Sequence, residues 1–281
     1  MTVLQEPLTD TATPLERYEE SLRLRGLAEN TRKGYAMYVR RFLDWADIDD
    51  CCVPPIQTYA EWINAMRVEG CGASSVKLRL AAGRSFYGFL GHDLAPLGDY
   101  KVPALPEPNP TPLPGGMTDV RRMIEAALTT AEAALVALGG FAGLRVGEST
   151  SLRWAGVDFG NDELLVVGKG DRFRRVPMNP DLRKILESRM AVGPSGPDDL
   201  VVGITREAAR RRIHRIGVDA RIAMPIVNSH DLRYTFATVL YENTGRDVLM
   251  VSKLLGHSSI ATTQKYLALG RAETRAAVSA L

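Results

Sequence analysis

The sequence is poor in the residues that form disulfides and metal sites. Its 281 residues include three cysteines and four histidines. Cys51 and Cys52 are adjacent, and no cysteine stands in a Cys-x-x-Cys pair. An odd number of cysteines without ligand spacing indicates reduced thiols, and argues against a disulfide framework or a zinc site.

Segments that would direct the chain to a membrane are also missing. We find no uninterrupted apolar run near the ~20 residues that a membrane span needs. The first twenty residues are acidic and polar, without the basic flank and apolar stretch of a signal peptide. With 45% hydrophobic and 24% charged residues, the chain has the composition of a soluble globular protein. We therefore expect a cytoplasmic protein that has no membrane partner.

Several catalytic motifs are absent. The sequence "VVGKG" resembles a phosphate loop, but glycine follows Lys169 and Glu163 stands where the first glycine of that motif belongs. There is no His-Glu-x-x-His, no Cys/His cluster and no Gly-x-Ser-x-Gly elbow. The best carboxylates for a metal-dependent nuclease are Asp158, Asp162 and Glu163, and an ordinary turn before a hairpin explains them.

Charge is nearly balanced overall but unevenly distributed. The formal net charge is +2. Residues 1–102 hold 12 basic and 14 acidic side chains, whereas residues 117–281 hold 23 basic and 18 acidic ones. Segment 205–221 carries six arginines against two acids, and segment 169–175 four basic residues against one acid. Such clusters are compatible with nucleic-acid binding, although solvated charged faces are the commoner reason for them.

A proline-rich segment separates two parts of the chain. Residues 103–116 contain six prolines and two glycines, a composition typical of a semi-rigid spacer. Before this spacer, helical periodicity and stop signals predict four helices, over 14–26, 29–46, 55–70 and 73–91. We expect Gly26 to end the first helix, and Asn30 or Thr31 to cap the second. The apolar stripe of the fourth is assigned to the core: Val76, Leu80, Phe86 and Leu90.

After the spacer the pattern is mixed. Segment 118–143 predicts two helices, the first capped by Thr118, and segment 162–178 predicts a β-hairpin around a Gly-rich turn. Helices resume at 180, and the last predicted one ends at Gly256. The fold class is therefore mainly α with a small β-hairpin or sheet.

A scattered set of polar residues suits one substrate, a phosphodiester. Arginines present forked donors that match phosphate oxygens, and a lysine on a hairpin can protonate a departing oxygen. A tyrosine attacks phosphorus only when cations and a proton acceptor help to form its phenolate. This chemistry requires no metal. Each residue alone also has an ordinary explanation, such as a helix salt bridge between Arg145 and Glu148. The set is Arg145, Glu148, Lys169, His230, Arg233, His257 and Tyr266.

The order and spacing of these residues resemble those of the tyrosine recombinases, the family of phage integrases and Xer-type resolvases. The similar segments are "AGLRVGESTSLRW", "GKGDRFRRVP", "HDLRYTFAT" and "LLGHSSIATTQKY". The resemblance implies a helical DNA-binding domain of the core type over 1–102, the linker 103–116, and an α+β catalytic domain over 117–281. It covers the catalytic part in detail and the N-terminal helices more weakly.

The resemblance also implies a role for each motif residue. Arg145 and Arg233 would clamp the scissile phosphate, and His230 would exchange a proton with the nucleophile. Lys169 would be the general acid for the 5′-hydroxyl, and His257 would hydrogen-bond the phosphate.

Tyr266 would be the nucleophile and form a 3′-phosphotyrosine, while Glu148 would support Arg145. Two positions depart from the family pattern: Ser149 stands where an apolar residue is usual, and Tyr234 where histidine often follows the motif arginine. Neither is a catalytic position, so we expect an active enzyme that needs neither a cofactor nor ATP.

For DNA contacts, the resemblance points to the basic helix before His230 and to the hairpin. Arg211 and Arg215 share one helical face with His214, and Arg172 and Arg174 lie in the hairpin. The two domains would enclose double-stranded DNA at a core attachment site. The family's working unit is a homotetramer that exchanges strands through a Holliday junction, in some members with a directionality factor.

The sequence also bears on the biological role. About a dozen residues precede the first helix, so we expect a simple integrase without an arm-binding domain. This favours integration or excision of phage or mobile-element DNA over Xer-type dimer resolution. The enzyme would work on nucleoid DNA, or in the host cytoplasm if phage-encoded. Residues 271–281 would dock on a neighbouring protomer, or alternatively act as a protease recognition signal.

Three further classes stay open. A DNA-binding protein with a decayed site would bind DNA without forming a covalent adduct, and a nuclease would require magnesium. An enzyme similar to type IB topoisomerases would share the chemistry but lack strict sequence dependence.

Overall fold

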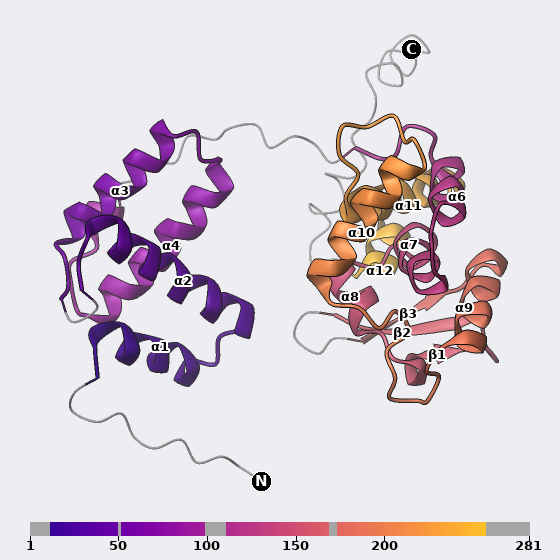
Figure 1. Ribbon diagram of the computed structural model, residues 1–281, viewed down its shortest axis with the longest axis horizontal. Helices are drawn as coiled ribbons and strands as arrows, with labels where there is room; N and C mark the ends of the chain where they lie inside the picture. Colours follow the sequence, from indigo (N-terminus) through magenta and orange to yellow (C-terminus); the bar gives the residue numbers. More distant parts are fainter. Residues whose placement is uncertain (1–11, 50–51, 99–110, 169–172, 257–281) are drawn as a thin grey trace. The chain divides into compact units, whose positions relative to one another are not determined.

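The computed structural model describes residues 12–49, 52–98, 111–168 and 173–256 (Figure 1). The chain forms two compact units, one extending to Glu107 and the other starting at Pro108. Each unit has its own hydrophobic core. The mainly helical class with a small antiparallel sheet is confirmed.

The first unit contains the four predicted helices. They are α1 (Pro14–Leu24), α2 (Glu29–Ala46), α3 (Ile56–Val68) and α4 (Ala73–Phe89), followed by the short α5 (Ala95–Gly98). The glycines after α1 and α3 adopt positive φ, +65° at Gly26 and +86° at Gly70. This left-handed conformation closes a helix without a Cβ clash, so both predicted stops are confirmed.

Two predicted N-caps are wrong, although the second helix starts at residue 29 as predicted. The second helix begins at Glu29, because the carbonyl of Ala28 already accepts the amides of Thr31 and Arg32 at 2.8 and 3.0 Å. In the second unit, α6 (Met117–Glu125) has Gly116 as its N-cap, so Thr118 lies inside the first turn. In both cases backbone geometry placed the start before the polar residue that sequence preference selected.

The core of the first unit is rich in aromatic rings. Three residues of the predicted stripe on α4 are buried, and Leu90 packs against them half-buried. Rings from four helices meet there at mostly steep interplanar angles, an arrangement that aromatic quadrupoles favour. These rings are Tyr18, Phe42, Tyr59, Trp62, Phe86 and Tyr87.

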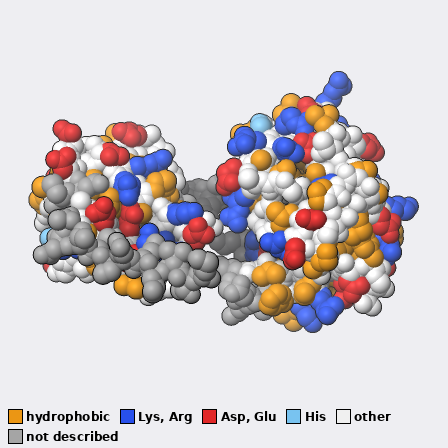
Figure 2. All heavy atoms as spheres, turned by 60° about the horizontal axis from the view of Figure 1, so that its bottom comes forward, with side chains coloured by type: hydrophobic (Ala, Val, Ile, Leu, Met, Phe, Trp, Pro, Cys, Tyr) orange, Lys and Arg blue, Asp and Glu red, His pale blue; other side chains and the backbone are white. Residues whose placement is uncertain are grey.

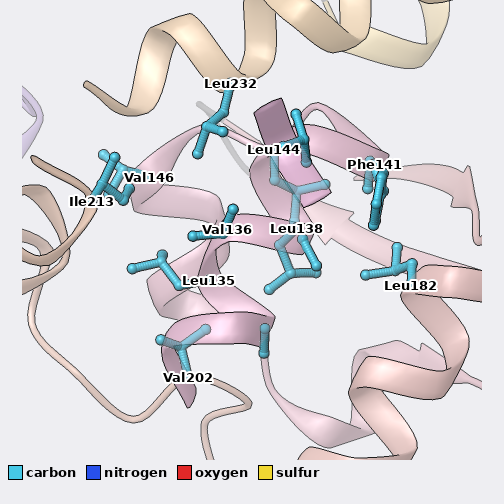
Figure 3. Packing of buried hydrophobic residues seen from close by; sticks show 14 of the residues in the cluster. Leu135, Val136, Leu138, Phe141, Leu144, Val146, Leu182, Val202, Ile213 and Leu232 are labelled. Atoms are coloured by element: carbon cyan, nitrogen blue, oxygen red, sulfur yellow. The ribbon is translucent and has the colours of Figure 1, made fainter. Parts of the chain in front are cut away.

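The second unit surrounds one apolar helix, α7 (Thr130–Ala142). Every residue from Ala134 to Ala142 is buried, as expected of a helix that is hydrophobic on all sides. Figure 3 shows side chains of neighbouring elements converging on it: Val146, Leu182, Ile213 and Leu232. Because these elements pack on one central helix, the segments that carry the polar motifs are held at fixed positions.

The remaining elements follow in chain order. They are α8 (Val146–Ser151), the 3-10 turn η1 (Trp154–Gly156), β1 (Val157–Asp158), β2 (Glu163–Val167), β3 (Phe173–Pro177), α9 (Pro180–Val192), α10 (Arg206–Asp219), α11 (Ser229–Asn243) and α12 (Val248–Leu255). The predicted hairpin is present, with Val167 opposite Phe173 and Leu165 opposite Arg175. Strand β1 adds a third, antiparallel member that the sequence did not reveal, since it is two residues long.

None of the described helices has the length and apolarity to cross a bilayer.

Candidate active site

The first part of the site is the turn that leads from α7 into α8. Gly143 has φ +63°, and a Cβ there would lie 2.4 Å from Cδ1 of Phe236, so only glycine fits. The turn places Arg145 as the residue that opens α8. The Arg145 amide donates to Oε2 of Glu148 at 2.8 Å, and its guanidinium donates to Oε1 at 3.0 Å. The side chain of Arg145 stays 39% exposed, so it can meet a ligand.

Glu148 is the centre of a cationic cluster. Its side chain is 7% exposed and contacts three guanidinium groups. Arg174 binds it through two hydrogen bonds of 2.9 and 2.8 Å, and Nη1 of Arg233 lies 3.8 Å from Oε2. Burial on its own would raise the pKa of Glu148. The hydrogen bonds and charge of Arg174, aided by Arg145, outweigh that effect and hold the pKa below its ordinary value.

We expect Glu148→Gln to destabilise the protein at neutral pH and to matter less in acid. Removing one member of a buried ion cluster typically costs about 3–5 kcal/mol. A lowered carboxyl pKa stabilises the fold above the unfolded pKa of about 4.3, and this contribution is lost as pH falls through the folded pKa. Thermal unfolding of variant and wild type at pH 7 and pH 4 measures the difference. Glu163→Gln is the control, because its partner Arg175 is exposed, and a gap of equal size at both pH values would contradict the expectation.

The second part of the site is the first turn of α11. Asn228 caps this helix, accepting the amide of His230 at 3.0 Å, while Asp231 accepts the amide of Asn228 at 2.8 Å. This reciprocal cap fixes the turn. His230 and Arg233 are three residues apart and share a helix face.

Arg233 is a buried guanidinium that joins two helix ends. Its side chain is 1% exposed. It donates to the carbonyl of Gly143, after α7, and to the carbonyl of Leu255, at the end of α12, the latter at 2.7 Å. Carbonyls at helix C-termini lack partners within the helix and carry partial negative charge, which suits a cation. Arg233 therefore fixes the turn that bears Arg145 against the end of α12.

His230 lies among positive charges from three helices. Partial burial of the ring lowers its pKa, and the charges of Arg233, Arg145 and Arg210 lower it further. The imidazole is then neutral at pH 7 and can accept a proton.

The cause of this shift can be tested by NMR titration of the His230 ring. We expect its pKa to lie below the ordinary 6.5 and to rise in Arg210→Ala, because removing a nearby positive charge favours the imidazolium. Arg211→Ala is the matched control on the same helix and should leave the pKa unchanged. An Arg210→Ala variant with the wild-type pKa would show that the charges do not act on this ring.

The structure brings together four of the predicted site residues: Arg145, Glu148, His230 and Arg233. Four others lie outside the described residues, namely Lys169, Arg172, His257 and Tyr266. Strands β2 and β3 flank the segment that holds Lys169, and α12 ends two residues before His257.

Arg174 does not occupy the DNA-facing position that we expected. Its side chain is 11% exposed and bonds Glu148 and the carbonyl of Leu254, the latter at 3.0 Å. The reason is strand alternation: Phe173 and Arg175 face solvent, whereas Arg174 and Val176 face inward. The inward apolar Val176 was the signal that could have revealed this.

Helix α10 presents basic residues on more than one face. Arg211 and His214 are exposed, in line with the sequence. Arg215 is partly engaged, since it bonds Asp219 and Glu132, each at 2.7 Å. Figure 2 shows several Lys and Arg side chains close together on the surface of the second unit, with a histidine among them.

Sequence reasoning missed two arginines of α10. A Cβ on Gly147 of α8 would lie 2.5 Å from Nη2 of Arg206, and the charge of Arg210 reaches His230. The two are four residues apart on one helical face, a spacing that could have indicated them.

The two departures from the family pattern lie beside the site. Ser149 is buried, and its amide donates to the carbonyl of Arg145 at 2.9 Å. The ring of Tyr234 lies 6.2 Å from that of His230.

The carboxylates considered for a nuclease belong to a turn, as interpreted from sequence. Asp158 accepts the amides of Gly160 and Asn161 at 2.9 and 3.0 Å, and Asp162 pairs with Arg183. Within the described ranges, no group of three or more His, Cys, Asp or Glu side chains could hold a metal ion.

Each of the two units matches a known protein-family model. The model of the phage integrase family matches residues 117–273, and that of the N-terminal SAM-like domain of phage integrases matches residues 15–93. Tyrosine recombinase XerC of Vibrio campbellii (strain ATCC BAA-1116) is 31% identical over 285 residues, covering 90% of this chain and 86% of XerC. Tyrosine recombinase XerD of Listeria monocytogenes serotype 4b (strain F2365) is 29% identical over 267 residues, covering 86% of this chain and 89% of XerD.

Solved structures share the fold. The Tn1549 transposon integrase in complex with circular intermediate DNA aligns with a TM-score of 0.68 at 21% identity, over 95% of this chain and 99% of that one.

Proposed function

This chain belongs to the phage integrase family of tyrosine recombinases, and from that membership we propose that it is a site-specific DNA recombinase. It cuts and rejoins duplex DNA through a 3′-phosphotyrosine intermediate. One observation carries the proposal for this chain: Arg145 and Arg233 lie against the buried carboxylate of Glu148, and His230 lies close enough to both guanidinium groups for their charges to lower its pKa. That arrangement offers positive charge and a neutral base at a single place.

The arginines have different roles in holding phosphate. Arg145 presents a partly exposed guanidinium whose forked donors match the non-bridging oxygens. Arg233 donates hydrogen bonds to the carbonyls of Gly143 and Leu255. It therefore contributes positive charge and holds the turn that bears Arg145. Preorganised charge stabilises the pentacoordinate transition state, and one such donor is typically worth about 10²–10³ in rate.

The chemical step is a transesterification. Neutral His230 accepts the phenolic proton of Tyr266, whose oxygen bonds to phosphorus as the bond to the 5′-oxygen breaks. Lys169 supplies a proton to that 5′-oxygen, and His257 hydrogen-bonds the phosphate. A 5′-hydroxyl from the partner strand then reverses the sequence and releases Tyr266. One phosphodiester replaces another, so ATP is not consumed.

For assembly, we propose two core DNA sites bound by four protomers. Each site is contacted by the helical domain 1–102 and by the catalytic domain 117–281. Strands exchange in pairs through a Holliday junction, and a directionality factor sets the direction. The exposed cations of α10 are candidates for phosphate contact.

Two biological roles are candidates for this activity. Integration or excision of phage or mobile DNA is the first candidate, favoured by the match to the phage integrase family. Resolution of chromosome or plasmid dimers is the second candidate, favoured by the similarity to XerC and XerD. Sequencing the DNA joints formed in cells separates them: a joint between an element and its host supports integration, and a joint within a replicon dimer supports resolution.

The test of the activity is a nicked core-site duplex, on which a cleaved strand diffuses away and traps the intermediate. The core site is first recovered by selecting bound genomic fragments. We expect a covalent adduct in EDTA. Binding without an adduct would favour a DNA-binding protein, an adduct only with magnesium a nuclease, and an adduct on any sequence a relaxing topoisomerase.

A further inference from the structure

Arg174 connects three elements of the catalytic unit. It lies on β3 and makes a bidentate pair with Glu148 of α8, at 2.9 and 2.8 Å. Its Nε donates to the carbonyl of Leu254 in α12 at 3.0 Å. Three donors of one guanidinium therefore reach two elements that are 26 and 80 residues away in sequence.

The fit around Arg174 is close. Gly256, which ends α12 with φ +65°, would place a Cβ 2.9 Å from Cδ of Arg174 and 3.2 Å from its Nη1. The end of α12 thus packs directly on the Arg174 side chain. Lysine cannot replace this contact, because an ammonium lacks the planar fork that pairs with a carboxylate in two places.

The three elements lead to different parts of the proposed reaction centre. Strand β3 follows the segment that contains Lys169, and Glu148 holds the phosphate ligand Arg145. Helix α12 ends two residues before His257. The hydrogen bonds of Arg174 link β3 to both α8 and α12.

We propose that Arg174 is a positioning residue for the recombination reaction, a role that rests on the proposed function. It sets the hairpin that carries Lys169 against the Glu148–Arg145 pair and the end of α12. The general acid Lys169 and the phosphate ligand Arg145 then act on the same phosphate. Catalytic geometry is sensitive to such placement, since a shift of about 1 Å can cost about 10²-fold in rate.

The neighbouring arginine provides a matched control. Arg175 lies next in the same strand, is 65% exposed and pairs with Glu163 at 2.8 Å. Its replacement by lysine makes the same chemical change one residue away, at a side chain that pairs with Glu163 and not with α8 or α12. The variants are Arg174→Lys, Arg174→Gln and, as the control, Arg175→Lys.

The readout compares two nicked core-site substrates under single-turnover conditions. One has the normal 5′-oxygen at the scissile phosphate, and the other has sulfur in that bridging position. When the phosphorus–sulfur bond breaks, the sulfur leaves as a thiolate. A thiol pKa near 8.5 is low enough that this leaving group needs no proton from Lys169. The sulfur substrate therefore restores the cleavage rate when the defect is a misplaced general acid. It does not restore the rate when the defect lies in folding or DNA binding.

We expect Arg174→Lys to fold and bind core DNA like wild type, and to cleave the oxygen substrate about 10²-fold more slowly. With the sulfur substrate the loss should shrink to less than about tenfold, and Arg175→Lys should match wild type on both. Equal losses on both substrates, or loss of fold or DNA binding in both Arg174 variants, would overturn the positioning role. A wild-type protein that forms no adduct with either substrate would instead overturn the proposed function.

Discussion

Tyr266→Phe is expected to abolish the covalent protein–DNA adduct while core-site binding stays at the wild-type level. The substitution removes only the phenolic oxygen, which is the atom that bonds to phosphorus in the proposed reaction. Phenylalanine keeps the ring, and the clamp residues Arg145 and Arg233 are untouched. A denaturing gel on nicked substrate measures the adduct, and a native gel measures binding.

A second tyrosine gives this experiment its control. The ring of Tyr234 lies 6.2 Å from that of His230, the proposed proton acceptor. Tyr234→Phe should form the adduct as wild type does. An adduct that persists in Tyr266→Phe and disappears in Tyr234→Phe would show that Tyr234, and not Tyr266, is the nucleophile.

Arg233→Ala is expected to have the largest combined effect on stability and cleavage. The change deletes the donors to the carbonyls of Gly143 and Leu255 and removes a cation near Glu148. Loss of one partner from a buried charged cluster costs about 3–5 kcal/mol. For a unit of this size that corresponds to a melting temperature lower by about 10 °C or more.

The catalytic loss should exceed what instability explains. At a temperature where Arg233→Ala is folded, we expect cleavage to be at least about 10²–10³-fold slower, because preorganised positive charge is missing. Lys184→Ala, on the exposed face of α9, is the control and should change neither the melting temperature nor the chemical step. A folded Arg233→Ala variant with wild-type melting and cleavage would show that this guanidinium neither holds the turn nor stabilises the transition state.

Local patterns carried most of what could be predicted. The helices of the first unit follow from apolar periodicity and from glycine stops such as Gly26 and Gly70. The contact of Arg145 with Glu148 follows from their three-residue separation at the start of α8. Each of these depends on residues within one or two helical turns, where propensity and spacing are informative.

What could not be predicted depends on tertiary structure. Strand β1 exists only because it pairs with β2, and its two residues carry no pattern of their own. The bonds of Arg233 to the ends of α7 and α12 span 90 and 22 residues. Strand alternation could have indicated that Arg174 faces inward, but its pairing with Glu148 spans 26 residues, a distance in sequence that gives no hint of contact. Charge alone made Arg174 look like a DNA ligand, whereas the fold uses it to balance a buried carboxylate.

The most direct test of the account is to identify the amino acid that becomes linked to DNA. The adduct formed on the nicked core site in EDTA is digested with protease and nuclease, and the linked peptide is sequenced by mass spectrometry. The account predicts a 3′-nucleotide phosphate on Tyr266. A nucleotide on any other residue, or no linked peptide from protein that binds the site, would contradict it.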